Sequence, residues 1–127
     1  MIDYKELRIG SITKQGIVHA ITYNKGKFGC YLHSHPFDSS GGEWFDMSDI
    51  DPLPITEYES ETLLKFGFKE GLRGNYLLEC NGEMFRYWLN SYFPKERMLF
   101  VVGKMKIECD YIHTLQNIMF VLTGKEL

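Results

Sequence analysis

Residues 76–89 read YLLECNGEMFRYWL, and this stretch decides the fold of the second half of the chain. Asn81-Gly82 is the strongest short signal for a two-residue β-hairpin turn, because such turns need positive φ angles. Side chains alternate between the two faces of a strand. One face of the return strand carries Phe85, Tyr87 and Leu89, and the other face carries Met84, Arg86 and Trp88. The stretch therefore predicts an antiparallel hairpin.

The residues that follow extend this hairpin into a four-strand antiparallel meander. Residues 98–102 and 105–109 form a second pair of apolar runs around Gly103-Lys104. In the last run, apolar residues alternate with Lys106 and Glu108, which is typical of a strand with one wet face. A helix is predicted on each side of the meander.

Both helices carry end signals in the sequence. Thr56 and Glu59 have capping-box spacing, which predicts a helix over residues 57–66, and Gly67 can end it. Asp110 is the expected N-cap of the second helix, and Gly124 its terminator. The apolar stripe of that helix is formed by Ile112, Leu115, Met119 and Leu122. We expect it to pack on the apolar face of the meander.

The first half of the chain is rich in short β-type runs. Residues 17–23, 28–33 and 44–47 are expected strands, and Pro52 and Pro54 stop the sheet. Their spacing predicts a small curled sheet or an SH3-like barrel. The fold class is therefore α+β. We expect a single domain over residues 1–127, with possible lobes at 1–55 and 56–127, because either half alone would be marginally stable.

Composition excludes several classes of function. The 127 residues carry a net charge of -3, which argues against nucleic acid as the partner. No apolar run approaches the roughly 20 residues of a membrane-spanning helix. The first six residues are mixed and charged, so we expect a cytoplasmic protein. Its three cysteines, Cys30, Cys80 and Cys109, are expected to be reduced.

Charge is concentrated in the middle of the chain. Residues 38–62 contain eight acidic residues and no lysine or arginine. One interpretation is a solvated linker followed by a helix start, where acids complement the helix dipole. The other is an acidic strip for a basic partner. The first is favoured, because helix starts commonly have this composition.

His33-Ser34-His35 is the sharpest candidate for a metal site. Residues two apart on a strand project from the same face, so two imidazoles could hold two corners of a zinc or other transition-metal site. Asp38, Asp46 or His19 could supply a third ligand. The spacing does not complete the ligand set, and Pro36 disturbs the strand. No cofactor is expected from the sequence.

Aromatic residues are the main candidates for partner binding. Too many of them lie in the first half for a small core to hide them all, so an exposed patch for a protein partner is expected. The alternative is that they fill the core. The candidate partner-binding residues are Tyr31, Phe37, Trp44, Asp46 and Asp49. The acidic neighbourhood argues against the stacking of unpaired bases.

No catalytic constellation is visible. His113 could act as a base, but the sequence places no nucleophile beside it. A residue that begins a helix and contacts the sheet is the simpler interpretation.

Three segments resemble a family of short bacterial proteins. Residues 6–10, ELRIG, resemble the family's "ELRIGN" opening, with Ser11 in place of the usual Asn. Residues 49–56 resemble its "IxPIPLT" segment. Residues 111–127 resemble its "YVHQLQNLYFALTGEEL" ending, with Thr114 in place of Gln. The family is found in phage-like and mobile-element neighbourhoods and has no assigned function, so the resemblance supplies no catalytic residues.

The leading hypothesis is a non-enzymatic interaction protein of phage or mobile-element origin. One alternative is a metal-dependent hydrolase or a metal-stabilised module that uses His33 and His35. The other is a nucleic-acid accessory protein that acts through the basic residues 1–37.

Overall fold

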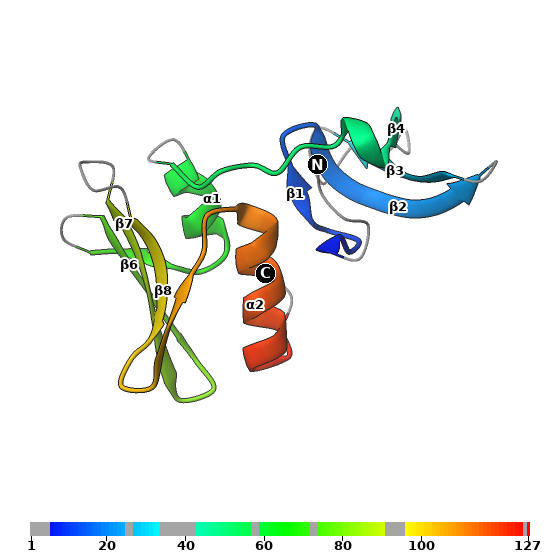
Figure 1. Ribbon diagram of the computed structural model, residues 1–127. Coiled ribbons are helices and arrows are strands. Elements are labelled where there is room, and N and C mark those ends of the chain that lie inside the picture. The colour runs from blue at the N-terminus through cyan, green and yellow to red at the C-terminus, as the bar shows by residue number, and fades with distance from the viewer. Residues whose placement is uncertain are drawn as a thin grey trace. The chain divides into compact units, whose positions relative to one another are not determined.

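The computed structural model describes residues 6–24, 27–33, 43–56, 59–71, 74–90, 96–125 and 127. It confirms the α+β class, with a four-stranded and a five-stranded antiparallel sheet and a C-terminal helix (Figure 1). The chain groups into two compact units. Unit 1 is Met1–Leu53 with Tyr111–Asn117, and unit 2 is Pro54–Asp110 with Ile118–Leu127. The expectation of a single domain stays a prediction.

Unit 1 contains the predicted curled sheet. Its strands follow chain order: β1 (Ile12–Thr13), β2 (Gly16–Asn24), β3 (Lys27–His33) and β4 (Glu43–Asp46). The register of β2 against β3 shifts between Val18 and Ala20, and such a bulge increases strand bending. The core of this unit is formed by Leu7, Val18, Cys30, Leu32, Met47 and Ile50. The finer assignment as an SH3-like barrel stays a prediction.

Strand β4 ends earlier than the sequence suggested. Met47 was expected to extend it, but Met47–Asp49 forms a short 3-10 helix, η2. Asp46 lies at the N-cap of η2, and its carboxylate accepts hydrogen bonds from the Ser48 backbone N–H and hydroxyl, both at 3.1 Å. An N-cap carboxylate satisfies helix-start donors that would otherwise lack partners. The cap therefore turns the chain out of the sheet after Asp46.

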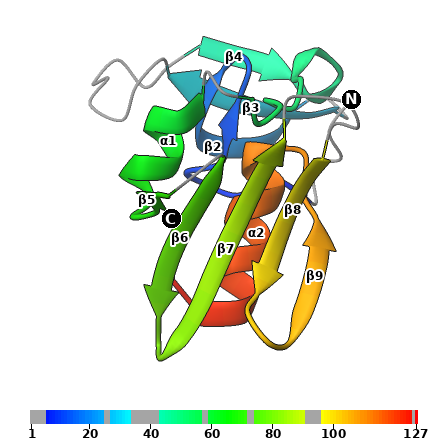
Figure 2. The same cartoon turned by 90° about the vertical axis from the view of Figure 1, so that its left-hand side faces the viewer.

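Unit 2 contains the predicted four-strand meander: β6 (Asn75–Cys80), β7 (Glu83–Asn90), β8 (Glu96–Val101) and β9 (Met105–Glu108). A two-residue strand that the sequence did not suggest, β5 (Lys69–Glu70), pairs with β6 at the edge. Asn81 and Gly82 have φ angles of 53° and 78°, as the predicted hairpin turn requires. Figure 2 looks onto these strands, with helix α2 (Ile112–Thr123) behind them.

Helix α1 (Ser60–Lys65) is shorter than predicted. The Glu59 carboxylate accepts a hydrogen bond from the Thr56 backbone N–H at 3.1 Å, as the capping-box spacing suggested. The N-cap, however, is Glu59 and not Thr56. At the other end Gly67 has a φ of 101°, and the Phe68 N–H donates to the Leu63 carbonyl at 3.1 Å. This confirms the predicted helix end.

Helix α2 begins at Ile112, so Asp110 lies two residues before it and is not the N-cap. Its end is as predicted, since Gly124 has a φ of 75° and its N–H donates to the Phe120 carbonyl at 2.7 Å. In the described part of the chain, no helix is long and apolar enough to cross a membrane. The three cysteines are free.

Candidate interaction surface

The sheet of unit 1 brings two of the candidate residues together. Tyr31 on β3 and Trp44 on β4 are direct cross-strand partners. Each keeps more than a third of its surface exposed, 39% for Tyr31 and 37% for Trp44. Because side chains alternate along a strand, both lie on the face opposite Cys30 and Leu32, which are buried in the core. We call this side of the sheet the aromatic face.

The backbone beneath Trp44 explains how its ring is held. A Cβ added at Gly29 would lie 2.2 Å from Cζ2 of Trp44, so the indole packs directly on the glycine backbone. Only a residue without a side chain allows this approach. The indole Nε1–H also donates to the Thr22 hydroxyl at 3.2 Å. The position of Trp44 is therefore fixed by residues on β3 and β2.

The acidic candidates lie near the same place but differ in role. Asp46 is two residues beyond Trp44 on β4, which puts it on the aromatic face. Its hydrogen bonds to Ser48 lower the pKa of the carboxyl, with a smaller effect from Lys27, whose Nζ is 3.9 Å away. The Asp46 carboxylate is thus used to cap η2. Asp49 is exposed on η2 itself and carries a negative charge beside the sheet.

A second aromatic pair extends the apolar surface of unit 1. Tyr23 and Phe28 are cross-strand partners at the far end of the β2–β3 pair, with ring centroids 4.8 Å apart. They lie on the face that carries Cys30, two residues further along the strands than this core residue. Tyr23 is 64% exposed. This pair was not singled out in the sequence, because alternation alone does not show where the core ends.

The remaining sequence candidates fall outside what the structure describes. His35 and Phe37 lie in the segment 34–42, and of His33 only the backbone, at the end of β3, is described. The described residues contain no group of three or more His, Cys, Asp and Glu side chains placed to hold a metal ion. The metal hypothesis therefore stays a prediction.

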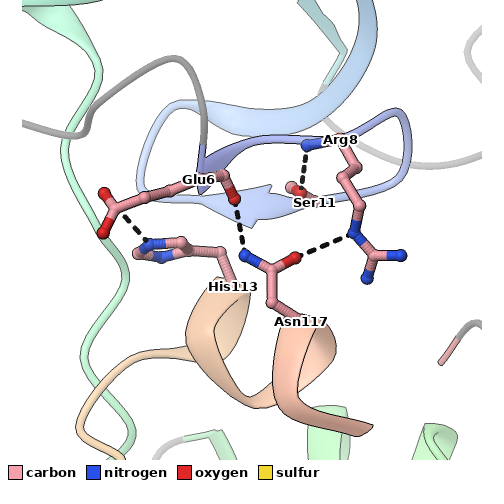
Figure 3. Close-up of polar contacts among 5 residues, drawn as sticks. All are labelled: Glu6, Arg8, Ser11, His113 and Asn117. Carbon is pink, nitrogen blue, oxygen red and sulfur yellow. Dashed lines mark hydrogen bonds and ion pairs between the residues drawn. The ribbon is translucent and has the colours of Figure 1, made fainter. Parts of the chain in front are cut away.

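A partly buried polar cluster links residues 6–12 to the first half of α2 within unit 1 (Figure 3). The Arg8 Nε–H donates to the Asn117 side-chain oxygen at 2.8 Å, and Asn117 in turn donates to the Glu6 carbonyl at 2.6 Å. Gln116, almost fully buried, accepts from the Ile12 N–H and donates to the Gly10 carbonyl, both at 2.9 Å. Residues 6–12 are thus held against the first half of α2 by side chains of that helix.

His113 belongs to the same cluster and does not resemble a catalytic base. It is 3% exposed, and its Nε2 lies 4.0 Å from a carboxylate oxygen of Glu6. Burial lowers the pKa of the imidazole, and the nearby Glu6 charge opposes this shift in part. Nδ1 forms no hydrogen bond within the described residues. Its surroundings fit a neutral, packed side chain.

Unit 2 has an exposed sheet face that the sequence analysis did not assign to any site. Arg86, Trp88 and Phe100 lie on the face of the sheet opposite the buried side chains of Phe85, Tyr87 and Leu99. The Arg86 guanidinium carbon lies 4.4 Å from the centre of the Phe100 ring and 5.9 Å from that of Trp88. Alternation predicted that Arg86 and Trp88 share a face, but not that Phe100 stands beside them.

No family model, no curated protein and no solved structure matches this chain. Its function therefore has to be argued from the exposed surfaces described above.

Proposed function

We propose that the chain is a non-enzymatic protein-interaction module that binds its partner through the aromatic face of unit 1. The observation that carries this proposal is the exposed Tyr31–Trp44 pair, with Trp44 fixed on Gly29 and Thr22. Tyr and Trp are enriched at the centres of protein interfaces, where a rigid ring loses little entropy on binding. The phage or mobile-element origin suggested by the family resemblance belongs to the same proposal.

The charge beside the aromatic face favours a partner with basic residues. Asp49 is exposed on η2, directly after β4, while Glu43 is the cross-strand partner of Leu32 and lies on the opposite face of β4. Carboxylates at the rim of an interface steer a positively charged partner and set its orientation more than they add affinity. The acidic strip proposed from the sequence would then serve the same partner as the aromatic pair.

The test compares the protein with a Tyr31→Ala/Trp44→Ala double variant in affinity capture from bacterial extract, followed by binding measurements with the purified partner. Loss of two central aromatic contacts should weaken binding by about 100-fold or more. Val121→Ala is the matched control, because Val121 is 79% exposed and lies outside the aromatic face. Equal binding by the double variant and the native protein would refute the proposal, provided that circular dichroism shows both to be folded.

A further inference from the structure

A row of five cross-strand partners crosses the outer face of the unit 2 sheet. The strand registers align one residue from each of the five strands, in the order Lys69, Leu77, Arg86, Phe100 and Lys106. Cations on β5, β7 and β9 thus alternate with apolar residues on β6 and β8. We call this line the cationic row. It contains no acidic residue, although the protein as a whole is acidic.

The centre of the cationic row is preorganised for an anion. Arg86 is stacked on Phe100 and near Trp88, which fixes the plane of its guanidinium group. Within the described residues Arg86 forms no hydrogen bond or ion pair, and its Nε is buried without an acceptor. Its terminal N–H groups are not among the buried atoms, so they can pair with a planar carboxylate through charge-assisted hydrogen bonds.

A cavity opens beside this arginine. It has a volume of about 480 Å³ and is lined by Arg86, Phe100, Lys104, Met105 and Lys106 among others. Lys104 is already paired with Glu83, which leaves Arg86 and Lys106 as the cations available to a ligand. The lining therefore suits a group with an apolar body and a negative charge.

The spacing of the cations matches the three-residue repeat of a polyproline II helix. Neighbouring strands are about 4.8 Å apart, so cations on every second strand repeat at about 9.6 Å across the face. A polyproline II helix has three residues per turn and rises about 3.1 Å per residue, so every third side chain points the same way at about 9.3 Å. The two repeats agree closely.

We propose that the outer face of the unit 2 sheet binds a partner's polyproline II segment that carries a carboxylate at every third residue. The carboxylates pair with Lys69, Arg86 and Lys106. The body of the segment lies over Leu77 and Phe100, with Trp88 beside it, since polyproline II segments dock on aromatic surfaces at low entropic cost.

Nucleic acid fits this surface less well than an acidic peptide. Glu79 and Glu108 lie on the same face, one residue pair to either side of the cationic row. A phosphate backbone that continued beyond the row would meet these carboxylates. A peptide that runs along the row, perpendicular to the strands, avoids them.

The probe is the synthetic peptide Glu-Pro-Pro-Glu-Pro-Pro-Glu, with Pro-Pro-Glu-Glu-Glu-Pro-Pro as a control of the same composition. We expect the first to bind at least about tenfold more tightly, because only its charges match the cation spacing. Arg86→Gln should weaken its binding about tenfold or more. Lys69→Gln/Lys106→Gln, which changes only exposed side chains, should weaken binding and reduce its salt dependence.

The Tyr31→Ala/Trp44→Ala variant should bind the peptide as the native protein does, so the outcome is independent of the function proposed for unit 1. Equal affinity for the two peptides, no saturable binding, or unchanged binding by both cation variants would overturn the inference. Tighter binding of an oligothymidine strand than of the peptide would also overturn it, because the occupant would then be nucleic acid.

Discussion

The position of the Trp44 ring depends on the absence of a side chain at Gly29. The indole occupies the space that any side chain at position 29 would need. Sequence alone suggested Trp44 as a binding residue but could not connect it to Gly29, because the two are joined by strand register and not by spacing. At the scale of single residues, this contact is what keeps the aromatic face in place.

Gly29→Ala should therefore destabilise the protein by about 1 to 3 kcal/mol, as expected when a packed site is overfilled. In a Trp44→Ala background the cost should fall, although not to zero, because the added Cβ would also lie 2.8 Å from the Phe45 carbonyl oxygen. Urea unfolding of the four proteins in this double-mutant cycle gives the coupling. Additive effects would show that Trp44 does not lie on Gly29 in solution.

His113 should make the stability of the protein depend on pH. Burial lowers the pKa of the folded imidazole, so below the unfolded value of about 6.5 the unfolded state binds more protons than the folded state. The free energy of unfolding should therefore keep the full contribution of neutral His113 above that pH, and it should decrease as the pH falls below it. Urea unfolding between about pH 7.5 and 5.5 measures this slope.

His113→Gln should flatten that slope, because it removes the titrating group. Val121→Ala, an exposed substitution that removes no titrating group, is the control and should leave the slope as it is. A slope that persists in His113→Gln would assign the pH dependence to other groups.

At the scale of elements, turns and the C-terminal ends of helices followed from local residues, while helix starts, strand register and extra strands did not. Asn81-Gly82 and Gly67 require particular φ angles, which the sequence states directly. Strand β5 has only two residues, and nothing in Lys69-Glu70 marks it as a strand until β6 lies beside it. The same limit hid the cationic row, which depends on four strand registers at once.

Gly82→Ala should cost about 1 kcal/mol, because Gly82 has a φ of 78° that disfavours any residue with a Cβ. The added Cβ would meet no atom within 4 Å, so the cost is one of backbone conformation alone. Gly71→Ala, at a position without a positive φ, should cost less. Thermal unfolding of the two variants compares them, and equal losses would contradict the assigned turn.

Gln116→Ala should loosen the attachment of residues 6–13 to the first half of α2. The Ile12 N–H and the Gly10 carbonyl would both lose their partner in a partly buried place, at a cost of about 1 to 3 kcal/mol. Asn117→Ala should cost less, since its hydrogen bond to the Glu6 carbonyl is exposed. Chemical unfolding measures both, and the opposite order would contradict the importance given to Gln116.

At the scale of the whole molecule, the protein presents two surfaces of different chemistry. Unit 1 has the aromatic face with the exposed Asp49 beside it, and unit 2 has the cationic row with aromatic neighbours. The sequence predicted the fold class and the aromatic candidates because both follow from composition and alternation. It placed the site residues less well, since Asp46 is used in capping and the unit 2 face combines residues from five strands.

The central claim is that the Tyr31–Trp44 pair binds a protein partner. The most direct measurement is the dissociation constant of the captured partner for the native protein, the Tyr31→Ala/Trp44→Ala variant and the Val121→Ala control. We predict a rise of about 100-fold or more for the double variant and no change for the control. The same dissociation constant for all three proteins would contradict the claim.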